Sequence, residues 1–210
     1  MQWPATLALV GILGYLLGSI PTGAIVGRAR GVDLRAVGSG STGATNALRS
    51  LGWPAALAVF AGDIAKGSLA VLVARLIAGE DAWASVIAAS TAVVGHGYSP
   101  WIGWRGGKGV ATAIGGLIVI SPTAFIAAFV AGFILIAVTR YVSLGSIVGT
   151  VLAGMIVLAL SGPQSLAYVA YAVCLPTFIL ISHRTNIARL LNGTERKLGE
   201  RLAAPASPGA

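Results

Sequence analysis

Four loops of the 210-residue chain combine small polar residues with basic ones. Residues 38–46 read GSGSTGATN and residues 95–112 read GHGYSPWIGWRGGKGVAT. Residues 140–146 read RYVSLGS and residues 183–197 read HRTNIARLLNGTERK. Glycines let backbone N–H groups converge, hydroxyls and amides add hydrogen-bonding groups, and Arg or Lys supplies positive charge. Each loop could also be an ordinary flexible connection, but together they favour binding of an anion, with phosphate the natural ligand.

Two familiar phosphate-binding motifs are excluded. The glycines of residues 38–43 match Gly-x-Gly-x-x-Gly, but a dinucleotide fold needs a strand before this loop and a βαβ unit around it. Apolar segments flank it instead. The pair Gly107 and Lys108 resembles the end of a P-loop, yet Gly109 stands where Ser or Thr would bind magnesium. Any phosphate site here is therefore of another kind.

Side chains for nucleophilic or metal chemistry are scarce. The chain has one Cys, Cys174, expected as a small buried apolar residue, and two His, His96 and His183. This set forms neither a nucleophile-base-acid triad nor an ordinary zinc or haem site. A His followed after four residues by Asp is also absent, because Trp101 and Ala188 stand there. We expect no metal and no cofactor. For each of the two histidines, a structural role and a catalytic role both remain open.

The composition excludes a soluble globular enzyme. Hydrophobic residues make up 56% of the chain and charged residues 10%, whereas soluble domains carry about 25% charged residues. We therefore predict an all-α, polytopic integral membrane protein. A single domain is expected over residues 1–202, followed by a disordered tail at 203–210.

Seven apolar runs are candidate transmembrane helices. The first lacks the basic start of a signal peptide, so we interpret it as a retained helix. The third and fourth are too short to cross alone, and either borrow flanking residues or form half-helices around a site. We favour seven transmembrane helices, with five full crossings as the alternative. The runs are 4–26, 54–78, 82–94, 110–120, 123–139, 142–160 and 165–182.

The basic residues predict the orientation. Of the 14 Lys and Arg residues, 12 lie after the first, third, fifth and last runs. By the positive-inside rule, the N-terminus lies outside and the C-terminus in the cytoplasm. The net charge of +8 thus reflects topology and requires no nucleic acid. All four polar loops face the cytoplasm, which strengthens the case for one shared anion site.

Two further patterns lie inside the apolar runs. Asp63 and Lys66 are three residues apart and share a helix face. They either neutralise each other as a structural pair or brace the site at the cytoplasmic end, since each alone is costly in a bilayer. Gly-x-x-x-Gly spacings predict close helix packing. They occur at Gly14/Gly18, Gly23/Gly27 and Gly145/Gly149.

The four loops, in this order, resemble those of the acyl-phosphate-dependent glycerol-3-phosphate acyltransferases. The resemblance runs from GSIPTGAIVG at residues 18–27 to Leu198. It implies transfer of an acyl group from an acyl phosphate to the 1-hydroxyl of glycerol 3-phosphate, giving 1-acyl-glycerol 3-phosphate and inorganic phosphate. It also implies a seven-helix enzyme of the bacterial inner membrane whose site faces the cytoplasm. Neither acyl-CoA nor acyl carrier protein would be the direct donor.

The resemblance also implies site residues. Those expected to be catalytic are Ser39, Arg49, Lys108 and Asn186. Those expected to contact substrate are Gly40, Gly43, Thr45, Asn46, His96, Gly107, Ser143, Ser146 and His183. Ser146 matches the serine of the VSLGS turn best, with Ser143 the runner-up. No protein base is expected, so a substrate phosphate would accept the hydroxyl proton. The first loop departs from the family pattern at Ser41 and Thr42, where Asn and Pro are usual.

The expected partners are the two substrates and membrane lipid. An acyl-phosphate-producing enzyme would hand over the donor, and a second acyltransferase would take the product. The rival interpretations are a phosphate or organophosphate transporter and a non-catalytic lipid-binding or assembly protein. A transporter needs a midplane site reachable from both faces and often shows repeat symmetry, whereas the polar loops lie on one face.

Overall fold

The computed structural model describes residues 3–162 and 165–200. Within these ranges the protein is all-helical, as predicted. The expected tail at 203–210 lies outside the described residues. The elements are α1 (Trp3–Ser19), α2 (Thr22–Ala29), α3 (Ala44–Leu51), α4 (Trp53–Ala78), α5 (Ala82–Gly97), the 3-10 turn η1 (Pro100–Ile102), α6 (Val110–Ile120), α7 (Pro122–Thr139), α8 (Val142–Ser161), α9 (Leu166–Ser182) and α10 (Arg184–Leu191).

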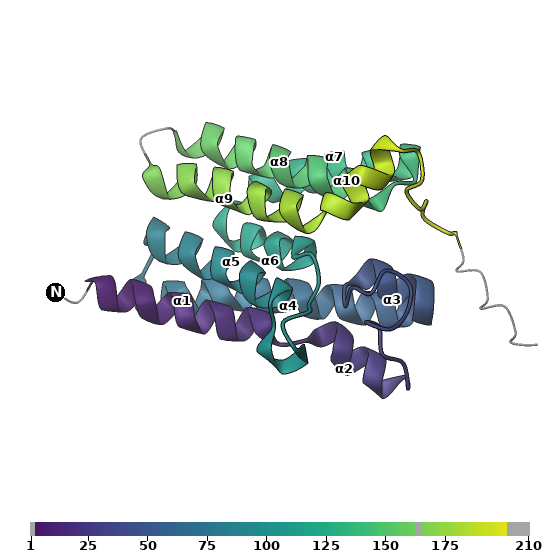
Figure 1. Ribbon diagram of the computed structural model, residues 1–210. Coiled ribbons are helices and arrows are strands. Elements are labelled where there is room, and N and C mark those ends of the chain that lie inside the picture. Colours follow the sequence, from purple (N-terminus) through teal and green to yellow (C-terminus); the bar gives the residue numbers. More distant parts are fainter. Residues whose placement is uncertain (1–2, 163–164, 201–210) are drawn as a thin grey trace, which may run out of the picture.

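The long helices form two packed groups that run along a common direction (Figure 1). Helices α1, α4, α5 and α6 pack together, and α8 packs between α7 and α9. Contacts between α5 and α9 and between α6 and α7 join the groups. The short helices α2, α3 and α10 lie at the end away from the N-terminus (Figure 1). The polar loops are therefore collected at one end of an apolar bundle.

Helix lengths confirm a membrane-spanning architecture without fixing the number of crossings. Among the described residues four segments are long and apolar enough to cross: α1 with α2, α4, α7 and α8. The pair α9 and α10, bent by 66°, would make a fifth. Helix α6 has 11 residues and α5 has 16, so the third and fourth runs are short, as predicted.

Three local features differ from the sequence-based expectation. The run 4–26 was expected as one helix, but it breaks before Pro21, because proline lacks an N–H donor and disfavours helix at the residue before it. The polar loops contain two helices that we did not predict, α3 and α10. Cys174 is exposed on α9 rather than buried.

Glycines bring α1 and α5 into close contact. A Cβ added at Gly14 would lie 2.7 Å from the Ala88 carbonyl oxygen. At Gly18 it would overlap the Ala92 backbone. Larger side chains at these positions would push the helices apart, so the predicted packing role of this spacing is confirmed.

The other two glycine spacings have different outcomes. Gly145 and Gly149 of α8 face Gly132 of α7, which confirms helix packing there. Gly23 and Gly27 instead contact loop backbone. Gly23 lies against the Thr42 carbonyl and Gly27 against the Val32 carbonyl. That spacing was wrongly interpreted as a helix-helix contact.

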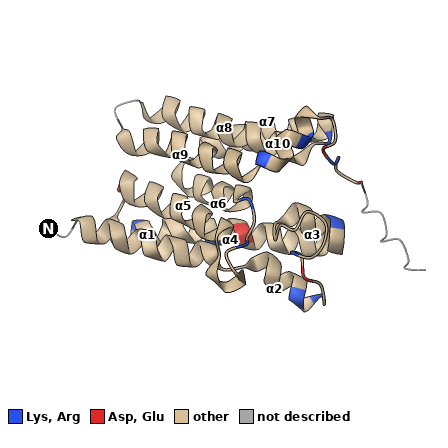
Figure 2. Cartoon of the chain, in the orientation of Figure 1, with Lys and Arg blue, Asp and Glu red and all other residues tan. Residues whose placement is uncertain are grey.

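Most described Lys and Arg residues gather at the end of the bundle opposite the N-terminus (Figure 2). At the N-terminal end Arg75 pairs with Glu80, with 3.3 Å between Nη2 and Oε2. This one-sided distribution agrees with the charge pattern on which the predicted orientation rests.

Candidate active site

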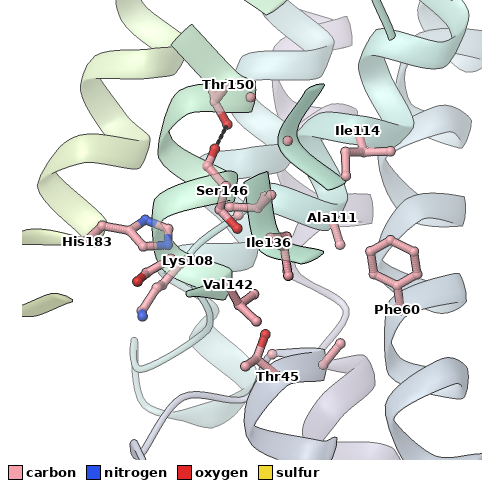
Figure 3. Close-up of a pocket in the computed structure, with 18 of the residues that line it drawn as sticks. Thr45, Phe60, Lys108, Ala111, Ile114, Ile136, Val142, Ser146, Thr150 and His183 are labelled. Carbon is pink, nitrogen blue, oxygen red and sulfur yellow. Dashed lines mark hydrogen bonds between the residues drawn. The ribbon is translucent and has the colours of Figure 1, made fainter. Parts of the chain in front are cut away.

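A cavity of about 580 Å³ lies where the polar loops meet the ends of the long helices. Its walls come from α4, α6, α7, α8 and the loops around them. In Figure 3, Lys108 and His183 lie on one side of the cavity, with Phe60 and Ile114 on the other. One end of the cavity is thus polar and cationic, and the remainder is apolar.

A hydrogen-bonded chain organises the polar end. Lys108 Nζ donates to Asn186 Oδ1, and Asn186 Nδ2 donates to Glu195 Oε1 at 2.6 Å. Ser143 Oγ donates to the same carboxylate oxygen at 2.9 Å. Arg189 Nε donates to Glu195 Oε2 at 2.7 Å. Glu195 thereby sets the position of Asn186, which in turn contacts Lys108.

Glu195 reaches this position because the segment after α10 folds back onto the corner between α7 and α8. Arg140, in a left-handed conformation with φ of 63°, accepts a hydrogen bond from Leu198 N at 2.7 Å. Its guanidinium Nη2 donates to the Leu198 carbonyl, also at 2.7 Å. Burial alone would raise the pKa of Glu195, but hydrogen bonds from Asn186, Arg189 and Ser143 outweigh it and lower that pKa. The carboxylate is therefore ionised.

Lys108 belongs to the GGK loop (residues 106–108), which is tied to the end of α5. Gly106 N donates to the Gly97 carbonyl at 3.0 Å and Gly107 N to the His96 carbonyl at 3.2 Å. Burial lowers the pKa of Lys108 to about 8, although Glu195 opposes the shift. Below that pH the side chain is a cation available to an anionic ligand.

Asn46 shapes the first loop from within. Its Oδ1 accepts from Ser39 N at 2.9 Å, and its Nδ2 donates to the carbonyls of Leu34, Val37 and Ser41 at 2.8, 3.1 and 2.9 Å. The side chain is almost wholly buried. Asn46, which was predicted to contact substrate, lines the larger cavity, and these bonds hold the loop closed around Ser39.

Arg49 projects from α3 into the mouth of the cavity. Its Nη2 donates to the Arg196 carbonyl at 3.4 Å. Burial is the largest cause lowering its pKa, and the charge of Arg196 adds to it. Guanidinium groups remain protonated in proteins, so Arg49 contributes positive charge beside the first loop.

His183 has a defined hydrogen-bonding state. Its Nδ1 lies 2.9 Å from the Ile179 carbonyl oxygen, which can only accept. The hydrogen is therefore on Nδ1, and a neutral ring leaves Nε2 as an acceptor. Of the two candidate serines, Ser143 is engaged with Glu195, whereas the Ser146 side chain forms no hydrogen bond among the described residues and lines the cavity.

His96 lies beneath the GGK loop in contact with the buried Asp63/Lys66 pair. Lys66 Nζ is 2.8 Å from Asp63 Oδ1 and 2.8 Å from His96 Nδ1. The predicted pairing on one helix face is confirmed. Because His96 also lines the cavity, the pair is connected to the site as well as neutralised.

The structure brings all of the predicted site residues to two adjoining cavities. Gly40 and Gly107 line a smaller cavity of about 280 Å³, which shares Ser39 and Lys108 with the larger one. The remaining predicted residues line the larger cavity: Ser39, Gly43, Thr45, Asn46, Arg49, His96, Lys108, Ser143, Ser146, His183 and Asn186. No group of three or more His, Cys, Asp or Glu suited to a metal ion occurs within residues 3–162 and 165–200.

Sequence reasoning missed three charged residues of the site and its apolar wall. Arg189, Glu195 and Arg196 line the cavity. All three belong to the 183–197 motif. The single acidic residue of that motif, standing among basic ones, could have indicated that the segment contributes to the site. Leu57 of α4 and Phe133 of α7 line the apolar part of the cavity and are 58% and 62% exposed, so this part reaches the surface of the bundle.

Comparison with known proteins identifies the family. A sequence model described as glycerol-3-phosphate acyltransferase matches residues 8–193. The chain belongs to the glycerol-3-phosphate acyltransferase family. Proteins with that name include one from Thermus thermophilus, 49% identical over 92% of this chain and 96% of the relative. Glycerol-3-phosphate acyltransferase 1 of Deinococcus radiodurans is 46% identical over 97% of this chain and all of the relative.

Solved structures of a family member share the fold. PlsY (YgiH) is described as an integral membrane glycerol 3-phosphate acyltransferase and was solved in a glycerol 3-phosphate form. That form superposes with a TM-score of 0.86 at 38% identity, covering 92% of this chain and 96% of PlsY. A lysophosphatidic acid form gives a TM-score of 0.84 at 37% identity, with 92% and 95% covered. This acyltransferase is accordingly an integral membrane protein.

Proposed function

We propose that the protein transfers the acyl group of an acyl phosphate to the 1-hydroxyl of glycerol 3-phosphate. The products are 1-acyl-glycerol 3-phosphate and inorganic phosphate, which makes this the first acylation of phospholipid synthesis. The observation that carries the proposal is the cavity itself. A cationic end bearing Arg49 and Lys108 continues into an apolar space open to lipid. Such a cavity suits one soluble phosphate substrate and one substrate with a hydrocarbon chain.

The two phosphates occupy neighbouring parts of the cationic end. Lys108 and Asn186, with His183 beside them, bind the phosphate of glycerol 3-phosphate. Arg49 and the first loop around Ser39 bind the phosphate of the donor. Charge-assisted hydrogen bonds of this kind are the strong ones and orient what they hold. The arrangement places the acceptor hydroxyl next to the acyl carbon.

The reaction proceeds by positioning and charge stabilisation. The hydroxyl oxygen forms a bond to the acyl carbon, and the bond from that carbon to the phosphate oxygen breaks. The hydroxyl proton passes to a substrate phosphate, and inorganic phosphate leaves. Fixed cations and amides stabilise the negative charge that develops, and holding both substrates together lowers the entropic barrier.

The apolar part of the cavity receives the acyl chain. It includes Phe60 of α4, Leu117 of α6 and Phe129 of α7. The space must be apolar, because exposing the chain to water would cost about 25 cal/mol per Å². Because this part reaches the surface of the bundle, a donor with a long chain enters from the membrane while its phosphate reaches Arg49.

We place the enzyme in the bacterial inner membrane with seven transmembrane helices. Its N-terminus lies outside, and its active site faces the cytoplasm. The one-sided basic residues support this orientation (Figure 2). Reporter fusions test it: a fluorescent protein fused to the C-terminus should be bright. Fluorescence only from an N-terminal fusion would contradict the orientation. An acyl-phosphate-producing enzyme and a second acyltransferase remain the proposed partners.

The deciding experiment uses purified protein in lipid with palmitoyl phosphate and glycerol 3-phosphate. We expect equal amounts of lysophosphatidate and phosphate without added CoA or metal. Lys108→Ala should lower turnover by roughly 10²- to 10³-fold, as loss of one stabilising group typically does. Lys197→Ala, which removes an exposed lysine beside the Tyr141 ring, is the matched control and should turn over normally.

Two results would overturn the proposal. Near-normal turnover by correctly inserted Lys108→Ala would remove the assigned role of that lysine. Absence of product, together with passage of glycerol phosphate across sealed vesicles, would instead identify a transporter.

A further inference from the structure

A buried polar cluster lies beneath the GGK loop and reaches three other elements. Asp63 and Lys66 come from α4, His96 from the end of α5 and Thr22 from α2. The side chains of Asp63, Lys66 and His96 are at most 5% exposed. Thr22 Oγ1 donates to Asp63 Oδ1. Buried charges are costly unless paired and hydrogen-bonded, so the arrangement of this cluster is strongly specified.

The hydrogen bonds of Lys66 determine which nitrogen of His96 carries the hydrogen. An ammonium group has three N–H donors and no acceptor. Lys66 Nζ lies 2.9 Å from the Ile20 carbonyl oxygen, 2.8 Å from Asp63 Oδ1 and 2.8 Å from His96 Nδ1. Because the ammonium cannot accept, its close contact with His96 requires Nδ1 to be the acceptor. The ring is then neutral, with its hydrogen on Nε2.

The opposite assignment leaves two donors facing each other. A hydrogen on Nδ1 could point to Asp63 Oδ1, at 3.3 Å. It would then stand 2.8 Å from Lys66 Nζ, which has only donors. A buried donor without an acceptor is destabilising. The network therefore selects the Nε2–H form.

The Nε2–H group lies against the GGK loop. A Cβ added at Gly107 would overlap His96 Nε2, so the ring is in contact with that residue's backbone. Among the described residues Nε2 has no hydrogen-bond partner, although the His96 side chain is buried. The ring also lines the larger cavity, and Gly107 and Lys108 line the smaller one beside it. One donor of a buried residue is thus left for a ligand at the GGK loop.

We infer that Asp63 and Lys66 are positioning residues that act through His96. They hold the imidazole neutral and direct its Nε2–H to the phosphate bound at the GGK loop beside Lys108. The break in the chain before Pro21 contributes, because the Ile20 carbonyl, which accepts from Thr22 N at 3.0 Å, has no partner in the next helical turn and also accepts from Lys66. The identity of the bound phosphate, that of glycerol 3-phosphate, rests on the proposed function.

Nuclear magnetic resonance of histidine nitrogens tests the inference without enzyme activity. The chain has two histidines, so tag-free protein labelled with ¹⁵N-histidine in lipid nanodiscs shows two rings. His183 donates from Nδ1 to the Ile179 carbonyl, whereas His96 carries its hydrogen on Nε2. We expect opposite tautomers at neutral pH, with the His96 signals assigned by their loss in His96→Asn. A charged His96 ring, or hydrogen on Nδ1 of both rings, would overturn the inference.

Kinetics separates positioning from a purely structural role. Lys66→Met alone leaves Asp63 buried without its cation, so the double variant Asp63→Asn/Lys66→Met removes both charges together. We expect it to fold, with KM for glycerol 3-phosphate raised about 10- to 100-fold, the usual effect of losing a hydrogen bond to a charged group. KM for the acyl phosphate should change less than about twofold. A folded double variant with wild-type KM values would contradict the inference.

Two single variants cover the case in which the double variant does not fold. His96→Gln can place an N–H near the position of Nε2, whereas His96→Asn cannot. In calorimetric titrations, the Gln variant should therefore retain more affinity for glycerol 3-phosphate than the Asn variant. Equal affinity of both with wild type would overturn the role of Nε2–H. Ser68→Ala, which removes a hydrogen bond from α4 to the Gly115 carbonyl that does not involve His96, is the control and should alter stability alone. The wild-type protein could show no turnover and yet show opposite tautomers for His96 and His183. This result would refute the proposed function but leave the tautomer assignment of His96 intact.

Discussion

Lys108 is a buried cation whose charge is sensitive to pH in the working range. Burial lowers its pKa to about 8, and the charges of Arg189 and Arg49 add to this effect. A lowered pKa means that the cation is present below about pH 8 and lost above it. We predict that kcat/KM for glycerol 3-phosphate falls as pH rises through about 8, since this ratio reports the free enzyme.

A pH series from about 7 to about 10 measures this fall. Lys108→Arg keeps a positive charge throughout, because guanidinium remains protonated. The variant should bind glycerol 3-phosphate less tightly than wild type, but its kcat/KM should not fall near pH 8. An identical fall in both proteins would mean that another group titrates.

Glu195 is the residue on which Asn186, Ser143 and Arg189 converge. Glu195→Gln preserves the shape but replaces a charged acceptor by a neutral amide. We predict a loss of about 1–3 kcal/mol in stability, and about tenfold lower turnover because Asn186 is no longer held toward Lys108. Thermal unfolding and product formation measure the two effects. Glu80→Gln, at an exposed carboxylate that pairs with Arg75, should leave both nearly unchanged.

Helix α1 offers a matched test of close packing at the scale of one element. A Cβ at Gly18 would overlap the Ala92 backbone, whereas at Gly11 its nearest neighbour is Ile87 Cγ2 at 3.2 Å. Overpacking against backbone costs about 1–3 kcal/mol. Gly18→Ala should lower the unfolding temperature in detergent, while Gly11→Ala should have little effect because the Ile87 side chain can shift. Equal effects would show that α1 and α5 slide apart freely.

The helices themselves were largely predictable because their signals are local. The run 110–120 coincides with α6, and the run 123–139 matches α7 to within one residue. Helices α3 and α10 were missed because their residues are polar and their short amphipathic pattern resembles a loop. Helices this short are stabilised by packing against other elements, and a pattern of a few residues does not reveal that packing.

At the scale of the whole molecule, residues of α4, α6, α7 and α8 line one cavity, the proposed acyl-chain site. Along α8 its lining runs from Val142 to Ala153, about 16 Å at the usual helical rise. Ala153→Phe fills the far end. We predict that kcat/KM falls about tenfold more for palmitoyl phosphate than for octanoyl phosphate, since only the longer chain reaches this position.

Met155→Phe is the matched control, because Met155 is on the same helix and is 63% exposed. It should leave the preference for chain length unchanged. Equal loss for both donors in Ala153→Phe would show that the chain lies elsewhere.

Sequence alone determined the membrane class, the apolar runs, the one-sided basic charge and the four polar loops, because composition and periodicity are properties of short stretches of chain. The resemblance added the expected site residues, all of which line the two cavities. Only the tertiary structure decided how they connect. Lys108 meets Asn186 across 78 positions of sequence and Ser143 meets Glu195 across 52. Such contacts arise from how whole helices pack, so no local pattern encodes them.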